Sequence, residues 1–463
     1  MRIHFISIGG VAMHNLALEL SQLGNVVSGS DDAIYEPSRS RLQQVGLLPQ
    51  AMGWFPDKIT SDLDIVILGM HAKKDNPELL EAQRLGLRIC SYPEFIYEHS
   101  KNKTRVVIGG SHGKTTITSM VLHVMNYCGI AVDYLVGAQL EGFERMVRLS
   151  QTAEFMLIEG DEYLSSPIDL KSKFHWYKPN IALVSGIAWD HINVFPTPEV
   201  YAQQFKVFVD SIVNGGILVY NEEDTLLVKI VNETENPIRK LPYHTPHYQI
   251  RKGITYLITE EGELPLEIFG KHNMSNLEGA KQICQHMGVD ENDFYQAILS
   301  FKGASKRLEK MYLSEKVAVF KDFAHAPSKV RATVASVVEQ FPEKEVEAFL
   351  ELHTFSSLRP EFLKEYAGSL DEATSAVVYY DEGALKTKGV ADISPEFIRK
   401  MFQREDIKVF NKSADFQEYI YNKTYNNSVL LLMSSGNYGG LNFQNLIDKI
   451  IKKILKTRQN EII

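Results

Sequence analysis

Short apolar runs alternate with helix-like stretches along the first hundred residues. "RIHFISI" (2–8) predicts a strand, and residues 9–24 predict a glycine turn followed by an amphipathic helix. "NVVSGSDD" (25–32) predicts a second strand that ends in acids, and "DIVILGM" (64–70) and "RICSY" (88–92) predict two more. Alternating strands and helices are typical of a parallel, doubly wound sheet, so this pattern predicts an α/β domain.

The same order of elements returns twice further along the chain. A polar stretch, "EHSKNKT" (98–104), precedes an apolar strand, a glycine turn and an amphipathic helix at 105–125. "VAVFKDFAHAPSKVRATVASV" (317–337) starts a third region, with buried strands at 346–352 and from 428 onward. We therefore predict an α/β fold of three domains: a Rossmann-like domain at 1–102, a central P-loop ATPase-like domain with a parallel sheet at 103–304, and a C-terminal Rossmann-like domain at 305–463.

Composition narrows the class of protein. Of the 463 residues 44% are hydrophobic and 23% charged, the balance of a soluble globular protein, and the net charge of −9 argues against nucleic acid or an anionic membrane as partner. No apolar run approaches the length of about 18 residues that spans a bilayer. The three cysteines are odd in number and far apart, which fits a reducing compartment without disulfides. We expect a cytoplasmic monomer or homodimer.

"IGGSHGKTTITSM" (108–120) contains a candidate phosphate-binding loop. Gly113, Lys114 and Thr115 match the end of the pattern G-x-x-x-x-G-K-[ST], although Ile108 stands in place of the first glycine. Backbone N–H groups from Gly110 to Lys114 would surround phosphate oxygens at the positive end of a helix dipole. Lys114 would reach the β- and γ-phosphates, and the Thr115 hydroxyl would hold Mg²⁺. The pattern predicts an ATP site; the alternative is a chance G-K-T at a turn.

Acidic side chains follow the next two predicted strands. "EFMLIEGDEY" ends in Glu159, Asp161 and Glu162, and "IALVSGIAWDHI" ends in Asp190 and His191. Because adjacent parallel strands end at the same edge of a sheet, these groups are expected beside the loop, where they would bind Mg²⁺ and the reacting phosphate. Each of them taken alone is equally compatible with a solvated strand end.

The turn after the first strand matches the dinucleotide fingerprint only in part. Of G-x-G-x-x-G/A it has Gly9 and Ala12, with Ser7 at the first position, and Asp31 follows about twenty residues on, where an acid meets a ribose or base. This predicts a nucleotide diphosphate at a helix N-terminus without choosing between NAD and a UDP-sugar.

Taken in order, these motifs resemble the Mur ligases, ATP-dependent enzymes that form amide bonds in the peptide of the cell-wall precursor. The resemblance covers essentially the whole chain. Its loop pattern, G-[TS]-x-G-K-[ST], lacks the early glycine, so Ile108 fits. The motifs that carry it are "HFISIGGVAMHNLA", "SGSDD", "GGSHGKTT", "EGDEY", "WDHINVF", "GKHNMSN", "KRLE", "DFAHAPSKV" and "MSSGNYGG".

The resemblance implies that ATP phosphorylates a carboxylate and that an amine then attacks the acyl phosphate. It implies Lys114, His191, Arg307, Asp322 and His325 as catalytic residues, the last two near the ribose or the amine. It also implies an ATP site formed by Gly110, Ser111, His112, Gly113, Lys114, Thr115, Thr116, Asn273 and Arg307. A Mg²⁺ site would be formed by Thr115, Glu159 and His191. A UDP-sugar site would be formed by Gly9, Gly10, Ala12, Ser30 and Asp31.

Three further residues, Lys206, His71 and His272, have two interpretations each. Lys206 lies fifteen residues after His191, where some relatives carry a carbamylated lysine that binds Mg²⁺, but residues 201–209 also fit an amphipathic helix with a solvated lysine. His71 and Asn76 could line the UDP-sugar cleft, although a histidine such as His71 is more often structural. His272 is either beside the adenine, next to Asn273, or an ordinary turn histidine.

The N-terminal turn is most similar to the family members that act directly on UDP-N-acetylmuramate. Some of these add L-alanine and others re-attach the recycled tripeptide L-alanyl-γ-D-glutamyl-meso-diaminopimelate. "LSSPIDLKSKFHWYKPNIAL" (164–183), with D-x-x-S-K-F and Y-x-P, is similar to the tripeptide-adding members, so the tripeptide is the predicted amine and L-alanine the alternative. Two stretches depart from the family: Ala326 replaces a second histidine, and "ELHTFSSLRPEF" (351–362) fits neither group.

Two functions of other classes compete with this interpretation. A nucleotide-dependent regulator would use the loop to hydrolyse ATP without any sugar nucleotide. An NAD-dependent oxidoreductase would use the first domain, and the incomplete fingerprint argues against it.

Overall fold

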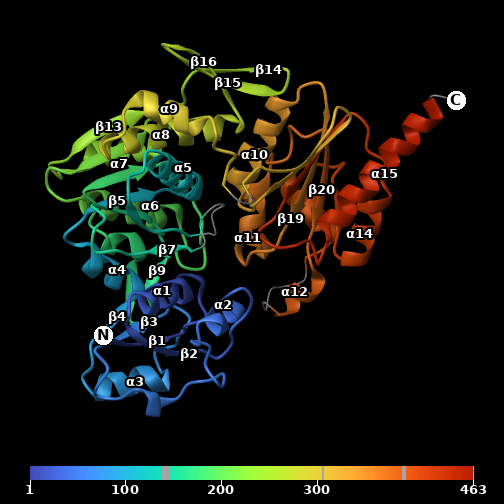
Figure 1. The fold of residues 1–463 in the computed structure, drawn as a ribbon. Helices are drawn as coiled ribbons and strands as arrows, with labels where there is room; N and C mark the ends of the chain where they lie inside the picture. Colours follow the sequence, from blue (N-terminus) through green and yellow to red (C-terminus); the bar gives the residue numbers. More distant parts are fainter. Residues whose placement is uncertain (138–142, 144, 305–306, 388–392, 462–463) are drawn as a thin grey trace. The chain divides into compact units, whose positions relative to one another are not determined.

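The computed structural model describes residues 1–137, 143, 145–304, 307–387 and 393–461 (Figure 1). The chain forms two compact units built from interleaved segments: Met1–Trp189, Pro196–His244 and Gly279–Ala297 in the first, and Asp190–Phe195, Thr245–Glu278 and Ile298–Ile463 in the second. The boundary predicted at 304/305 falls beside residues 305–306, which lie outside the described residues. The three predicted domain ranges therefore stay a prediction.

The first unit begins with a four-stranded parallel sheet in the order β2-β1-β3-β4. Strands β1 and β3 are mostly apolar and buried because helices pack on the sheet, among them α3, which Asn76 caps by accepting the N–H groups of Glu78 and Leu79. The elements are β1 (Arg2–Ile6), α1 (Val11–Gln22), β2 (Val26–Ser30), α2 (Ser38–Gln44), β3 (Ile65–Leu68), α3 (Pro77–Arg84), β4 (Ile89–Ser91) and α4 (Tyr92–Ser100).

A seven-stranded sheet, in the order β13-β12-β11-β5-β8-β6-β7, forms the rest of the first unit. All neighbouring pairs are parallel except β6 and β7, and a short hairpin, β9–β10, with the helical turn η2 lies between β8 and β11 in the chain. The strands are β5 (Thr104–Gly109), β6 (Val132–Leu135), β7 (Val147–Arg148), β8 (Phe155–Glu159), β9 (Leu164–Ser166), β10 (Asp169–Ser172), β11 (Ile181–Val184), β12 (Ile217–Asn221) and β13 (Arg239–Tyr243).

Two helices of this part begin at residues that cap them through their side chains. Thr197 caps α6 through its side chain, Pro198 occupies the first turn, and Asp224 caps α7. The elements are α5 (Lys114–Tyr127), η2 (Lys173–Trp176), α6 (Pro198–Asp210), α7 (Thr225–Glu233) and α9 (Glu291–Ile298). Helix α8 (Lys271–His286) continues from residues of the second unit into residues of the first.

The second unit contains a six-stranded sheet in the order β17-β18-β22-β19-β20-β21, parallel except for β17. Alternate residues of each strand enter two cores, as the two-residue period of a strand requires. Phe320, Leu350 and Leu431 pack against α10, α11 and α13, whereas Val319 and Leu430 pack against α14 and α15. The strands are β17 (Glu309–Leu313), β18 (Val317–Asp322), β19 (Glu345–Glu351), β20 (Ser375–Tyr379), β21 (Lys408–Phe410) and β22 (Ser428–Met433).

The helices of this sheet lie on both of its faces, as in an α/β three-layer fold. They are α10 (Pro327–Gln340), α11 (Pro360–Leu363), α12 (Glu382–Thr387), α13 (Pro395–Phe402), α14 (Ser413–Asn422) and α15 (Phe443–Glu461). The same unit also holds a small antiparallel sheet of β14 (Tyr248–Arg251), β15 (Ile254–Thr259) and β16 (Gly262–Leu266), which the sequence analysis did not predict.

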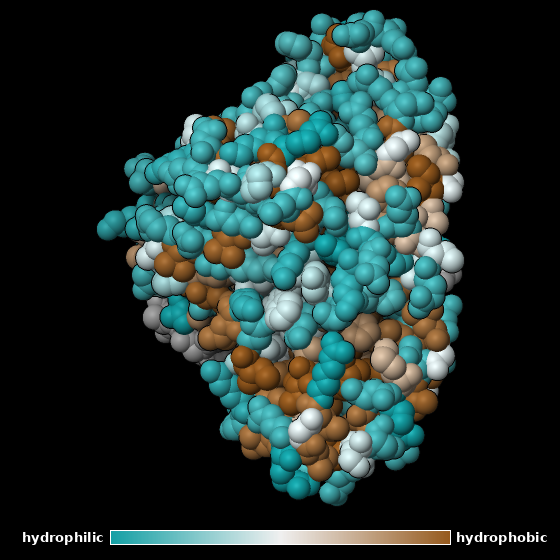
Figure 2. All heavy atoms as spheres, turned by 90° about the vertical axis from the view of Figure 1, so that its left-hand side faces the viewer, coloured by the Kyte–Doolittle hydropathy of each residue, from teal (hydrophilic) through white to brown (hydrophobic). Residues whose placement is uncertain are grey.

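The predicted α/β class with parallel sheets is confirmed. On the face drawn in Figure 2, hydrophilic residues cover most of the surface and hydrophobic ones form smaller areas among them. Within the described part of the chain, every helix is too short or too polar to cross a membrane.

Candidate active site

The predicted phosphate loop connects β5 to α5, in the strand–turn–helix context that the sequence predicted. Gly110 and Gly113 have φ angles of +129° and +78°, which favour glycine. A Cβ on Gly110 would lie 2.1 Å from Ser185 Oγ, so a side chain there would displace the loop. Two hydrogen bonds hold the loop to the segment after β11: Ser111 N donates to Gly186 O at 3.0 Å, and Ala188 N donates to the side-chain oxygen Ser111 Oγ at 2.9 Å.

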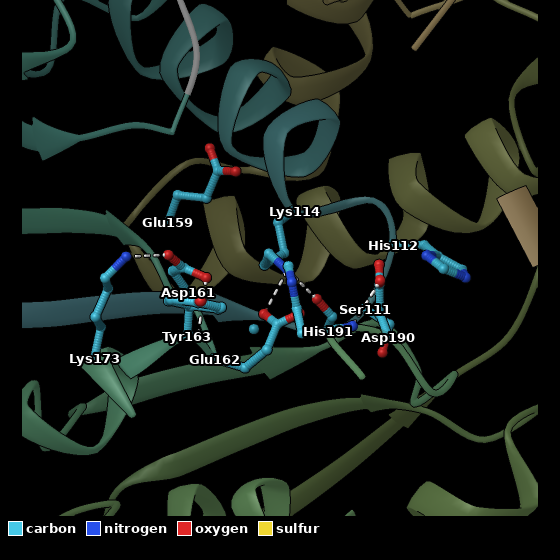
Figure 3. A network of polar contacts seen from close by, with 12 residues as sticks. Ser111, His112, Lys114, Glu159, Asp161, Glu162, Tyr163, Lys173, Asp190 and His191 are labelled. Carbon is cyan, nitrogen blue, oxygen red and sulfur yellow. Dashed lines mark hydrogen bonds and ion pairs between the residues drawn. The ribbon is translucent and has the colours of Figure 1, made fainter. Parts of the chain in front are cut away.

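Two oxygens accept hydrogen bonds from the Lys114 ammonium, one in the phosphate loop and one on the acidic motif (Figure 3). Lys114 Nζ is 2.5 Å from Gly110 O and 2.7 Å from Glu162 Oε2. Burial lowers the pKa of Lys114, but the carboxylates of Glu162, Asp161 and Glu159 outweigh that effect and hold its pKa above the ordinary value. The lysine is therefore charged when it faces a phosphate.

Asp161, the second acid of this motif, pairs with a lysine from the η2 turn. Lys173 Nζ lies 2.6 Å from Asp161 Oδ2 (Figure 3) and above the rings of Tyr92 and Tyr163. Burial raises the pKa of Asp161, and Lys173 together with Lys114 lowers it further than burial raises it, so the net pKa is below the ordinary value. The carboxylate is charged and neutralised by the neighbouring cation.

Thr115 and Glu159 supply oxygens at the start of α5 and the end of β8. Thr115 Oγ1 donates to Glu159 Oε1 at 2.8 Å, and Glu159 Oε2 accepts from Gly137 N at 2.8 Å. A hydroxyl and a carboxylate side by side match the hard oxygen donors that Mg²⁺ prefers, so these two residues fit the predicted ion. Among the described residues no group of three or more His, Cys, Asp or Glu side chains could hold a metal. Such a sparse donor set suits an ion that keeps waters and phosphate oxygens as ligands.

Asp190 and His191 belong to the second unit. Asp190 Oδ1 accepts from His191 N at 2.7 Å, and Asp190 Oδ2 lies 3.5 Å from Lys329 Nζ on α10. Burial raises the pKa of Asp190, but the nearby charges, led by Lys329, lower it well below its usual range. His191 itself has a φ of +54°, an uncommon backbone conformation for a histidine. The ion pair fixes the carboxylate that holds this strained turn.

Asp322 organises the loop after β18. Its Oδ2 accepts from Leu308 N at 2.6 Å and its Oδ1 from Ala324 N at 2.7 Å, so the carboxylate ties the residue after Arg307 to the turn that carries His325. The Arg307 guanidinium lies over the Phe323 ring, 5.0 Å from its centroid. The structure thus brings the three predicted catalytic residues of this unit, Arg307, Asp322 and His325, onto one loop cluster.

Adjacent to that cluster, Asn273 and His272 lie in the first turn of α8. Asn273 Nδ2 donates to Phe269 O at 2.9 Å, and His272 Nδ1 is 2.9 Å from Ser336 Oγ on α10. Burial lowers the pKa of His272. Both side chains have internal partners, so the adenine role of Asn273 stays a prediction.

Asp31 lies against the turn after β1, as the fingerprint predicted. Its Oδ2 accepts from Gly9 N at 2.7 Å, and a Cβ on Gly9 would lie 2.8 Å from Ile34 Cγ1 and 2.9 Å from that oxygen. Burial raises the pKa of Asp31. Ser30 Oγ accepts from Lys58 Nζ at 3.2 Å. Gly10 caps α1 and its carbonyl lies 2.9 Å from His14 Nδ1, while Ala12 is within the first turn of the helix.

The remaining predicted residues lie as follows. Thr116 is buried in α5, and His112 O accepts the Ser185 hydroxyl. His71 is exposed, and Asn76 has the structural role of capping α3. Lys206 is part of α6, with Nζ 3.9 Å from Glu233 Oε2 and 39% of its side chain exposed. That position supports the solvated alternative rather than a metal ligand.

Sequence reasoning missed two contributors to the site. Tyr201, on the buried face of α6, donates to Glu162 Oε1 at 2.8 Å and is 2.9 Å from Ser111 Oγ. Lys173 pairs with Asp161. Neither belongs to a nucleotide-binding motif; the D-x-x-S-K-F stretch marked Lys173 only as part of an insertion.

Comparison with known proteins shows the family to which the chain belongs. The model of the Mur ligase family catalytic domain matches residues 2–104, and that of the Mur ligase middle domain matches residues 108–283. The UDP-N-acetylmuramate–L-alanine ligase of Caldicellulosiruptor bescii is 30% identical over 405 residues, which cover 85% of this chain and 86% of the relative. This chain belongs to the Mur ligase family.

Two further similarities add a relative and a solved structure. The UDP-N-acetylmuramate–L-alanyl-γ-D-glutamyl-meso-2,6-diaminoheptandioate ligase of Escherichia coli K12 is 27% identical over 463 residues, covering 98% of this chain and 99% of the relative. The murein peptide ligase of Psychrobacter arcticus has a similar fold, with a TM-score of 0.66 at 22% identity over 97% of this chain and 98% of that one. The predicted ATP-dependent ligase that forms C–N bonds is confirmed at the level of the family.

Proposed function

We propose that this Mur ligase joins the lactyl carboxylate of UDP-N-acetylmuramate to the amine of L-alanyl-γ-D-glutamyl-meso-diaminopimelate, with ATP and Mg²⁺. The observation that carries the choice of amine is the segment from β9 to η2. It holds the D-x-x-S-K-F stretch, similar to the tripeptide-adding members, and places Lys173 on Asp161 beside the phosphate loop.

That segment is anchored to α6 rather than loosely exposed. Phe174 stacks on Phe208 with ring centroids 4.6 Å apart and meets Phe205 edge-on at 5.5 Å. His175 Nε2 lies 2.8 Å from Gln204 O. A fixed insertion at the acidic motif supports a distinct task for this branch of the family, and the E. coli relative with the tripeptide name is similar over nearly its whole length.

In the proposed reaction the carboxylate attacks the γ-phosphorus of ATP and ADP leaves. The amine nitrogen then attacks the acyl carbon, the amine loses a proton, and inorganic phosphate leaves as the amide forms. Lys114 and the loop N–H groups would hold the transferring phosphoryl oxygens, and Thr115, Glu159 and His191 would hold Mg²⁺, which neutralises the developing charge. Gly9, Gly10, Ala12, Ser30 and Asp31 would bind the UDP moiety, and Arg307, Asp322 and His325 would face the nucleotide or the amine.

L-alanine is the second candidate amine, because the C. bescii relative, at 30% identity, is an L-alanine ligase by name. Phosphate release from Mg-ATP with UDP-N-acetylmuramate separates the two, with L-alanine in one arm and the tripeptide in the other and product mass as confirmation. We expect release with the tripeptide only, and no release in Lys114→Ala. Release with L-alanine only would reassign the amine, and release without UDP-N-acetylmuramate would favour a regulator that hydrolyses ATP.

A further inference from the structure

The phosphate loop and its lysine are joined by a chain of buried hydrogen bonds that runs through a tyrosine outside the motifs. Ser111 Oγ is 2.9 Å from Tyr201 Oη, which donates to Glu162 Oε1 at 2.8 Å, and Glu162 Oε2 accepts from Lys114 Nζ at 2.7 Å. Lys114 Nζ also donates to Gly110 O in the loop, at 2.5 Å. The carboxylate is thus held on both oxygens, by a phenol on one side and an ammonium on the other.

Tyr201 and Glu162 are both buried, at 0% and 1% exposed. In a water-poor setting a hydrogen bond to a charged group is stronger and its geometry is better defined than in water. If the Glu162 carboxylate rotated away from Tyr201, it would lose this hydrogen bond at a position with little access for water. Its second oxygen therefore presents a fixed acceptor to Lys114.

The tyrosine itself stands on a rigid support. It lies in the first turn of α6, which Thr197 caps, and its ring packs on Phe205 with centroids 5.3 Å apart. The same helix carries Phe208, on which Phe174 stacks next to Lys173, the partner of Asp161. One helix thus supports the partners of both Asp161 and Glu162.

We propose that Tyr201 is a positioning residue of the ATP site: through Glu162 it sets the place of the Lys114 ammonium, and through Ser111 it sets the place of the loop. It does not touch the nucleotide; it acts on the groups that do. The inference rests on the assignment of the loop to ATP. It depends on the proposed function only in one respect, the choice of substrates with which turnover is measured.

The test compares Tyr201→Phe with Tyr425→Phe. Tyr425 is also buried, and its phenol donates to the backbone oxygen Ile420 O at 3.1 Å in the other unit, so the control removes a buried phenolic hydrogen bond to a neutral acceptor. For both variants, Mg-ADP affinity is measured by calorimetry and kcat and KM by phosphate release. Their Tm values are measured as well. We expect Tyr201→Phe alone to weaken Mg-ADP binding and lower kcat, each by about tenfold, which corresponds to about 1.4 kcal/mol. KM for the amine should stay within about twofold of wild type.

A double-mutant cycle that combines Tyr201→Phe with Ser111→Ala tests the chain of hydrogen bonds itself. Both changes interrupt the same chain of hydrogen bonds. The double variant should therefore bind Mg-ADP at most about twofold more weakly than whichever single variant has the lower affinity. The proposal is overturned if Tyr201→Phe binds Mg-ADP like wild type, if Tyr425→Phe loses as much affinity, or if the two losses multiply in the double variant. If neither amine supports turnover while Tyr201→Phe still weakens Mg-ADP binding, the proposed function fails and the positioning role stands.

Discussion

The imidazole of His325 should remain neutral at a pH where a histidine in water is almost fully protonated. Burial, aided by the Lys329 ammonium and opposed by Asp190, lowers its pKa to about 4. His325 Nδ1 lies 2.8 Å from Phe323 O. Since a carbonyl can only accept, Nδ1 carries the hydrogen and Nε2 keeps its lone pair. A neutral imidazole at this position can accept a proton, which suits a residue predicted near an attacking amine.

The size of the effect follows from the two pKa values. At pH 5.5 a histidine with the ordinary pKa of 6.5 is about 90% protonated, whereas one with a pKa of about 4 is about 3% protonated. The difference between these two pKa values corresponds to about 3 kcal/mol. Because the folded protein binds fewer protons than the unfolded chain between about pH 4 and pH 6.5, this stabilisation is complete above pH 6.5 and is lost as the pH falls toward 4.

Nuclear magnetic resonance of protein labelled in its histidines measures this directly. The ring signal absent from His325→Gln identifies His325, and its position is followed from pH 8 to pH 4.5. We expect little movement above pH 5.5 in wild type, and a higher midpoint in Lys329→Met, which removes a cation that lowers this pKa. Lys206→Ala, which removes a cation paired with Glu233, is the control and should not move the signal. A midpoint near pH 6.5 in wild type would refute the argument from burial.

Three further predictions follow from the phosphate loop and α6. Gly110→Ala should abolish Mg-ADP binding in calorimetry because its Cβ would lie 2.1 Å from Ser185 Oγ at a φ of +129°; Gly215→Ala, also at positive φ but with no atom within 4 Å of the added carbon, should bind Mg-ADP normally and lose about 1 kcal/mol of stability. Lys114→Ala should lower kcat for phosphate release at least about a hundredfold with an unchanged circular dichroism spectrum, and wild-type turnover in this variant would contradict the ATP site. Lys206→Ala should retain wild-type kcat, with or without added bicarbonate. A lower kcat in the variant, together with a wild-type kcat that depends on bicarbonate, would instead support a carbamylated lysine.

The local elements of this chain could be predicted because their causes are local. Apolar runs such as 2–8 and 105–109 mark buried strands, since parallel strands covered on both faces are mostly apolar. The polar side chains within these runs, His4 and Arg105 among them, are buried with hydrogen-bond partners. The glycines of the phosphate loop are needed where φ is positive, and the motif that contains them is read from neighbouring residues. The antiparallel sheet of β14–β16 was missed because its strands are partly exposed and carry polar residues, so they lack that apolar signal.

The acids of the "EGDEY" motif show where prediction from sequence stops. Their presence beside the loop follows from strand order, but their partners do not. Tyr201 lies 39 residues from Glu162, and Lys173 lies 12 residues from Asp161 on a turn fixed by aromatic stacking. The role of Asn76 as a helix cap was likewise not predicted: its amide oxygen caps α3, and its place in the UDP-sugar cleft stays a prediction.

The sequence by itself determined the family, the α/β class, the phosphate loop and the acidic residues that accompany it, because each is encoded in a short contiguous stretch. Only the tertiary structure decided which groups hold Lys114, that Lys206 faces Glu233, and that Asp190 to Phe195 belongs to the second unit while the residues on either side belong to the first. The physical reason is that hydrogen bonds and ion pairs depend on the distance and orientation of side chains to within about an ångström. Those quantities arise from the packing of segments that are distant along the chain.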